Sequence, residues 1–147
     1  MQKEPSLIQG EQYKDKRGSI SFVNLFFMDE VKRFYIITPQ NTHIIRAWQG
    51  HRKEEKWFHV LDGSFLVVLV KIDNWSAPSE ALNHQKFVLD ANNNQILHIP
   101  KGYANGFMAL ESNAKLLIFS SCRLEESATD DYRFDEKKWY DWAKSNN

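Results

Sequence analysis

The chain has 147 residues, 42% of them hydrophobic, which is enough to bury the core of one domain without disulfides. Lysine plus arginine equals aspartate plus glutamate at 19 each, so charge gives no reason to expect a nucleic acid or an anionic membrane as partner. The sequence has no bilayer-length apolar window and no apolar signal-peptide core near the N-terminus, and it has a single cysteine, Cys122. We therefore expect a cytoplasmic protein.

Short strand-like runs separated by turn residues follow one another along the chain, a pattern typical of an all-β sandwich or barrel. The first runs lie at 18–27, 31–38 and 42–51. In the next run, 56–72, Asp62-Gly63 stands between two hydrophobic stretches and predicts a hairpin. After a polar loop at 73–85, further strands are expected at 86–90, 96–100, 107–111 and 114–121, with a turn over 101–106.

The C-terminal part has a different character, because Asp130-Asp131 precedes a charged, aromatic-rich segment. Acidic residues suit the start of a helix, so we expect a short C-terminal helix over about 130–145. About eight to ten strands with one terminal helix suit a double-sheet jelly roll. The prediction is thus a single domain over 1–147 with its core at about 15–125, and a small-molecule site at the mouth of the barrel.

The stretch "RAWQGHRKEEKWFHVLDGSF", residues 46–65, resembles the metal-binding cupins. Such a site uses a His-x-His pair, a carboxylate and a third histidine, and the corresponding positions here are Gln49, His51, Glu55 and Asn105. Two imidazoles are replaced by carboxamides, which bind transition metals weakly. We therefore expect no bound metal and no other cofactor; an unusual ligand set is the alternative, which elemental analysis would test.

The same stretch, with "RGSI" at 17–20 and "VKRFYIIT" at 31–38, resembles the bacterial nucleotide-sugar 3,4-ketoisomerases. The segment "IPKGYANGF" at 99–107 is similar to a turn of the related deoxysugar 3,5-epimerases. The likeness covers most of residues 15–140 and implies a metal-free cupin, a double-stranded β-helix, acting as a homodimer in polysaccharide biosynthesis. The implied substrate is a thymidine-diphosphate-linked 4-keto-6-deoxysugar. Gln49, Ala47 and Asn105 depart from the patterns of these families.

Isomerising such a sugar requires a general base beside the ketone and a donor at the developing oxyanion. His51 is a candidate base, because an unperturbed imidazole titrates near neutrality; the alternative is that it only ends a strand in a polar turn. On a regular strand Gln49 shares the face of His51 and could bind a sugar hydroxyl.

The resemblance implies two further catalytic residues. Lys56 stands where a 3,5-epimerase carries the lysine that stabilises its enolate, although a solvated charge in "RKEEK" is the other interpretation. Tyr132 resembles a C-terminal tyrosine that acts as an acid in the epimerases, although a tyrosine on an amphipathic helix can simply pack.

The remaining candidates would bind substrate. Arg46 matches an arginine of both families and suits a phosphate, but strand parity turns 46 and 51 to opposite faces unless a bulge intervenes. Tyr35 could offer its hydroxyl to the sugar or its ring to thymine, or could pack in the core. Tyr103 and Asn105 are expected on a turn at the barrel mouth.

The sequence thus predicts a sugar-nucleotide isomerase that catalyses 3,4-ketoisomerisation, or 3,5-epimerisation, through an enediolate. The alternative is a non-catalytic nucleotide-sugar or carbohydrate-binding cupin that has lost its acid–base pair. Gln49 and Asn105 favour that alternative, because amides bind hydroxyls but do not exchange protons near neutral pH.

Overall fold

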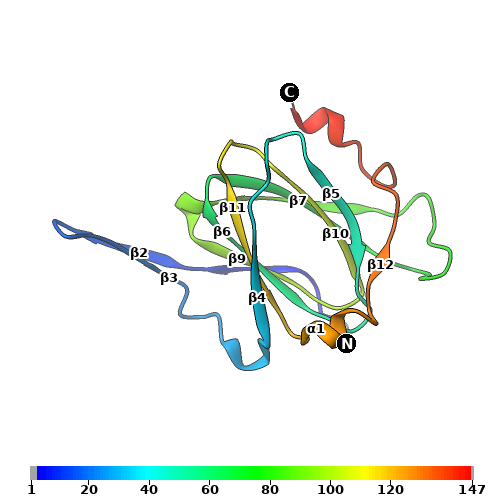
Figure 1. The fold of residues 1–147 in the computed structure, drawn as a ribbon, viewed down its shortest axis with the longest axis horizontal. Helices are drawn as coiled ribbons and strands as arrows, with labels where there is room; N and C mark the ends of the chain where they lie inside the picture. Colours follow the sequence, from blue (N-terminus) through cyan, green and yellow to red (C-terminus); the bar gives the residue numbers. More distant parts are fainter. Residues whose placement is uncertain (1–2, 147) are drawn as a thin grey trace.

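Two five-stranded antiparallel sheets packed face to face form the body of the molecule (Figure 1). The computed structural model describes residues 3–146. The first sheet has the order β1 (Ser6–Gln9), β9 (Gln95–Ile99), β6 (Lys56–Asp62), β11 (Lys115–Ser120) and β4 (Arg33–Ile37). The second has the order β12 (Tyr132–Arg133), β5 (Ile45–Gly50), β10 (Tyr103–Ala109), β7 (Ser64–Lys71) and β8 (His84–Asp90). These sheets confirm the prediction of an all-β jelly roll.

The other elements are small. A two-stranded hairpin, β2 (Glu11–Asp15) and β3 (Gly18–Phe22), projects from the body (Figure 1). The helices in the described part of the chain are α1 (Leu124–Ser127) and three 3-10 turns at Met28–Glu30, Ala91–Asn93 and Trp142–Asn146. None of the helices within residues 3–146 is long and apolar enough to cross a membrane.

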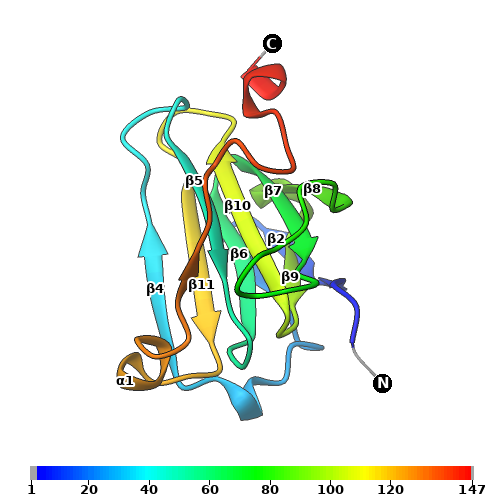
Figure 2. The same ribbon diagram turned by 90° about the vertical axis from the view of Figure 1, so that its right-hand side faces the viewer.

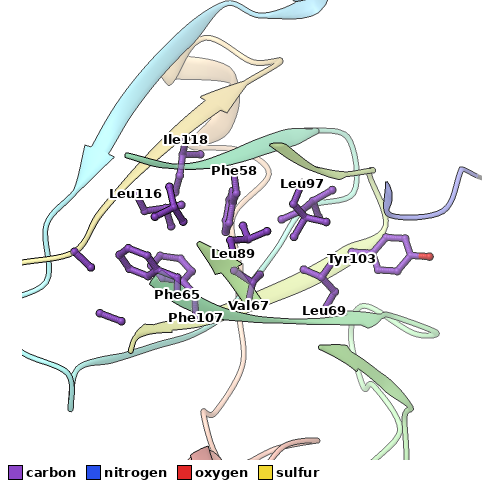
Figure 3. Packing of buried hydrophobic residues seen from close by; sticks show 14 residues of the cluster. Phe58, Phe65, Val67, Leu69, Leu89, Leu97, Tyr103, Phe107, Leu116 and Ile118 are labelled. Carbon is purple, nitrogen blue, oxygen red and sulfur yellow. The ribbon is translucent and has the colours of Figure 1, made fainter. Parts of the chain in front are cut away.

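The main core lies between the sheets (Figure 3), where alternate residues of facing strands interdigitate. Phe58 of the first sheet and Phe65 and Phe107 of the second are at its centre. The apolar run of β7 is nearly continuous rather than alternating because both its faces are covered. Its outward side chains, such as Val68, pack under the C-terminal segment together with Trp142 (Figure 2 shows that segment crossing the second sheet).

The predicted hairpin at Asp62-Gly63 is wrong in one respect. Two strands do meet there, but β6 belongs to the first sheet and β7 to the second, and the two do not pair with each other. Gly63, with φ 72°, turns the chain from one sheet to the other, a backbone conformation that other residues resist. Both strands then direct alternate side chains into one core, which a flat hairpin would not allow.

Three other boundaries differ from the expectations. The first sheet begins before residue 15, because β1 pairs with β9 at its edge. The turn expected over 101–106 is shorter, because β10 already begins at Tyr103, opposite Lys71 of β7. The helix expected over 130–145 is replaced by β12 and irregular chain, and only the turn at Trp142–Asn146 is helical. Aromatic side chains packing on the second sheet override the helical charge pattern.

Candidate active site

A cavity of about 470 Å³ opens between the sheets at the side formed by β4, β5 and β12. Its apolar walls come from the core and include Ile37, Phe58, Phe107 and Ile118. The polar residues that line it are Arg33, Tyr35, Arg46, Gln49, Lys56, Asn105 and Arg133. Four of these side chains are cations, and none of the described lining residues is acidic. The cavity therefore suits an anionic small molecule.

A β-bulge in β5 determines which of its side chains reach the cavity. Gln49 pairs with Asn105 and Arg46 pairs with Phe107, so two residues of β5 oppose the single Gly106 of β10. The extra residue brings Arg46 and Gln49 to the same face, the face of Asn105 and Phe107. Strand parity in the sequence allowed Arg46 to reach the site only if β5 contained a bulge, and the structure contains that bulge.

Lys56, the first residue of β6, is the most deeply buried cation of the cavity, with only 3% of its surface exposed. Its Nζ donates a hydrogen bond to Oε1 of Gln49 at 2.9 Å and lies 5.7 Å from the centre of the Tyr35 ring. Burial lowers the pKa of Lys56 to about 8, although the negative charge of Glu54 opposes this shift.

The side chain of Gln49 has a defined orientation. Its Nε2 donates to Oδ1 of Asp131 at 3.1 Å, and a carboxylate can only accept. The amide oxygen is therefore directed at Lys56. Arg133 in turn donates to Asp131 at 2.7 Å, so the row of hydrogen bonds from Lys56 ends at the cavity rim.

Tyr35 and Arg33 form the wall on β4. The Arg33 guanidinium lies 5.0 Å from the centre of the Tyr35 ring, and it donates to the carbonyl of Cys122 and to Oγ of Ser127. Burial, and secondarily the charge of Glu54, raise the pKa of Tyr35 to about 12. The phenol therefore keeps its proton at neutral pH and offers a donor to the cavity.

His51 follows the end of β5 and is not among the described residues that line the cavity. Its Nδ1 lies 2.6 Å from the carbonyl oxygen of Asp130, which can only accept, so Nδ1 carries a proton. Its Nε2 is buried without a hydrogen-bond partner in the part of the chain that the structure describes. Burial, and then the charge of Lys56, lower the pKa of this imidazole.

Glu54 places a carboxylate beneath the site. It is 2% exposed and accepts hydrogen bonds from Ser120 at 2.6 Å and Ser127 at 2.8 Å. One oxygen lies 3.7 Å from Arg33 and the other 3.5 Å from Nδ1 of His51. This buried negative charge offsets part of the surrounding positive charge without entering the cavity lining.

Asp130 fixes the loop that carries His51 and Glu54. Its carboxylate accepts backbone N–H bonds from Arg52, Lys53 and Glu54, each at 2.8 Å. Together with the carbonyl contact to His51, these bonds tie residues 51–54 to the C-terminal segment.

Besides His51, two further candidates from the sequence lie outside the cavity lining. Tyr103 is buried at the edge of the core, and its hydroxyl points away from the cluster (Figure 3) and donates to Glu4 at 3.1 Å. Tyr132 packs its ring against Trp75, 5.0 Å away, because it sits in β12 rather than on a helix. The cavity is lined instead by its neighbour Arg133, which strand alternation turns the other way.

The structure brings together Arg46, Gln49, Tyr35, Lys56 and Asn105, whose Nδ2 donates to the Gln49 carbonyl at 3.2 Å. It adds residues that sequence reasoning missed. Arg33 could have been found by parity, because it lies two residues before Tyr35 on one strand. Glu54, Asp130 and Arg133 carry no local signal.

The cupin ligand positions are not assembled as a metal site. Glu55 turns to the other face of the first sheet, where its Oε1 lies 2.6 Å from Nε2 of His98. Within residues 3–146, no group of three or more His, Cys, Asp or Glu side chains is arranged to hold a metal ion.

Comparison with known proteins gives one family. The model of the dTDP-4-dehydrorhamnose 3,5-epimerase family matches residues 3–142. No curated protein is similar enough to count as a match.

Solved structures with the same fold include two kinds of enzyme. A mutant of the 3,4-ketoisomerase QdtA from Thermoanaerobacterium thermosaccharolyticum, in complex with TDP-4-keto-6-deoxyglucose, is 23% identical, with a TM-score of 0.72 over 91% of this chain and 90% of that chain. The dTDP-4-dehydrorhamnose 3,5-epimerase of Bacillus anthracis, with TDP and pyrophosphate bound, is 18% identical, with a TM-score of 0.75 over 91% and 80%. The epimerase RmlC of Legionella pneumophila, with dTDP-4-keto-L-rhamnose, is 20% identical, with a TM-score of 0.73 over 90% and 73%.

Proposed function

Because this chain belongs to the dTDP-4-dehydrorhamnose 3,5-epimerase family, we propose that it isomerises a thymidine-diphosphate-linked 4-keto-6-deoxysugar. The reaction is a 3,4-ketoisomerisation or a related 3,5-epimerisation through an enediolate. The observation that carries this proposal is the cavity lined by four cations, two carboxamides and a phenol, with no acidic side chain among its described lining residues.

The cations divide by depth. Arg46 and Arg133 are exposed at the rim, where guanidinium groups can each hold phosphate oxygens in bidentate fashion. Lys56 lies at the inner end beside Gln49, and Asn105 is buried next to them. A nucleotide sugar would therefore place its diphosphate at the rim and its keto sugar against the amides.

The chemistry needs a group that takes a proton beside the ketone and a positive charge near the oxyanion. Lys56 and His51, which lie near one another beside Glu54, are the residues that we assign to this chemistry. Tyr35 offers a neutral hydroxyl to the sugar from the opposite wall.

Solvent exchange tests the proposal directly. The purified protein should incorporate deuterium from D₂O into TDP-4-keto-6-deoxyglucose at a carbon next to the ketone, followed by proton NMR. Thermal unfolding with and without TDP gives the matching binding test, because a ligand of the folded state raises the melting temperature. Binding of TDP without any exchange would contradict the isomerase proposal.

That last outcome would favour the second candidate, a nucleotide-sugar-binding cupin without turnover. Its support is that Gln49 and Asn105 line the cavity, whereas His51 lies outside the lining. A His51→Asn or Lys56→Arg substitution would then leave no activity to lose.

We also propose a homodimer in the cytoplasm. The outer face of the first sheet exposes Phe34 and Ile36 on β4 and Leu61 on β6, and exposed apolar side chains gathered on one face suit an interface. A second copy of the chain packed on this face would bury it. Sedimentation of the wild type and of an Ile36→Asp variant tests this, since only the variant should run as a monomer. Cys122 is free, which suits a reducing compartment.

A further inference from the structure

The described titratable side chains that line the cavity differ in what they can do near neutral pH. Tyr35 keeps its proton, because its pKa is raised to about 12, and arginines remain charged. Lys56 is the remaining titratable residue of the described lining, and His51 lies outside that lining.

Lys56 also has an environment that allows it to release a proton. Its Nζ donates to Oε1 of Gln49, a neutral acceptor, instead of forming an ion pair with a carboxylate. The orientation of that amide is fixed from behind by Asp131. One N–H is thus anchored, and the rest of the amine faces the lined space.

His51 is placed differently. Its protonated Nδ1 is committed to the carbonyl of Asp130, and the residue is not among the described residues that line the cavity. A base has to come within hydrogen-bond reach of the proton that it removes, and in this structure the Lys56 amine satisfies that requirement better than the imidazole.

We propose that Lys56, rather than His51, removes the proton beside the sugar ketone and returns it to the neighbouring carbon. This assignment rests on the proposed function. The neutral amine takes the proton from C3, the electrons of that C–H bond form the C3–C4 double bond, and the carbonyl electrons move to O4. The resulting ammonium is then the positive charge beside the enediolate.

The second half of the reaction restores the amine. In a 3,4-ketoisomerisation the ammonium gives its proton to C4, while the proton of the 3-hydroxyl passes to O4, leaving a 3-ketone. Atoms and charge balance without a cofactor. Gln49, which stands where the relatives' histidine is expected, then acts as a positioning residue that holds Nζ.

Several charged groups face Lys56 from the surrounding elements. Glu54 and Asp131 raise its pKa, whereas Arg33 and Arg133 lower it, and burial outweighs all of them. Burial is also how other proteins tune a lysine for general base catalysis near neutral pH.

A direct titration tests the proposal without any substrate. NMR of the protein labelled with ¹³C at the lysine ε-carbons, with Lys56→Arg to assign the signal, should give a midpoint near the pKa of about 8. A midpoint near the ordinary pKa of 10.5 would overturn the proposal whether or not the protein is active.

Deuterium exchange into TDP-4-keto-6-deoxyglucose separates the two candidate bases. Lys56→Arg keeps the positive charge but not a base, so exchange should fall about a hundredfold or more while TDP affinity stays within about threefold. The exchange that remains in His51→Asn should still rise around pH 8, because Lys56 is retained. Exchange that survives in Lys56→Arg, or loses its pH dependence in His51→Asn, would overturn the proposal.

Gln49→Glu tests the role of Gln49 through the pH dependence of exchange, which would not change if Gln49 only supported the fold. A carboxylate at this position would raise the pKa of Lys56, so the exchange rate should begin to rise at higher pH. An unshifted profile would contradict the assignment. A wild-type protein that neither binds TDP nor exchanges would instead contradict the proposed function, and the NMR titration would still decide the protonation behaviour of Lys56.

Discussion

The carbonyl oxygen of Asp130 lies 2.6 Å from Nδ1 of His51, while the carboxylate of the same residue accepts three backbone N–H groups of the loop that follows His51. One residue of the C-terminal segment thereby sets both the tautomer of the imidazole and the path of the loop. The position of Glu54 depends on the same contact, because its own N–H is one of the three.

Asp130→Asn should therefore destabilise the protein. An amide cannot accept all three N–H bonds, and hydrogen bonds to a buried charged group contribute about 1.5–3 kcal/mol each. We expect urea denaturation to show a loss of roughly 2–4 kcal/mol, with the control Asp131→Asn changing the free energy of unfolding by less than about 1 kcal/mol. Equal effects of the two substitutions would contradict the role of Asp130.

Glu54→Gln should lower the pKa of Lys56 further, because the charge of Glu54 raises that pKa. The measurement is the ¹³C titration of Lys56 in the variant. Glu55→Gln is the matched control, since this neighbouring carboxylate pairs with His98 on the other face of the sheet. We expect a downward shift in the first variant and no shift in the second.

The stability of the protein should rise with pH between 7 and 9.5. The pKa of Lys56 is about 8 in the folded state and 10.5 ordinarily, so in this window the unfolded state binds more protons and stability increases as pH rises. The gain should be about 2 kcal/mol. Well below pH 8 the lysine is charged in both the folded and the unfolded state, so the full cost of burying the charge lowers the free energy of unfolding.

Urea denaturation at several pH values measures this effect. The difference between wild type and Lys56→Met cancels the contributions of the groups whose titration Lys56 does not influence. Stopping at pH 9.5 avoids the tyrosines, Tyr35 and Tyr103, whose raised pKa values act in the opposite direction above pH 10. A difference that does not change with pH would refute the depressed pKa.

Arg46→Ala should weaken TDP binding about ten- to a hundredfold, which corresponds to the loss of about 1.5–3 kcal/mol from charge-assisted hydrogen bonds. Arg133→Ala should act in the same direction. Arg52→Ala is the control, because this arginine is exposed nearby but does not line the cavity. Isothermal titration calorimetry at fixed salt measures the TDP affinity of all three variants. Equal losses of affinity in the three would mean that TDP responds to the net charge of the protein rather than to arginines in a defined site.

The sequence predicted the architecture well because strand alternation and turn residues are local signals. It placed Arg46, Gln49, Tyr35, Lys56 and Asn105 in one site, which the cavity brings together. These residues lie on strands, where alternation and one bulge decide which side faces inward.

The errors arose where tertiary contacts override local pattern. Asp62-Gly63 has the composition of a hairpin turn. The apolar residues on both sides of it are buried in one core, however, because the two strands lie in opposite sheets that face each other. The sequence places Tyr132 on a helix, but its pairing with Gly50 and the tilted packing of its ring against Trp75 turn it away from the cavity. The position of His51 depends on Asp130, 79 residues further along the chain, which no local window includes.

The bulge at Ala47 and Trp48 separates the length of β5 from the side chains that it presents to the cavity. Removing one of these two residues would put β5 in regular phase with β10, with Arg46 still opposite Phe107 and Gln49 still opposite Asn105. Arg46 would therefore keep its place at the rim of the cavity. The same pocket side chains can thus be carried by a strand one residue shorter.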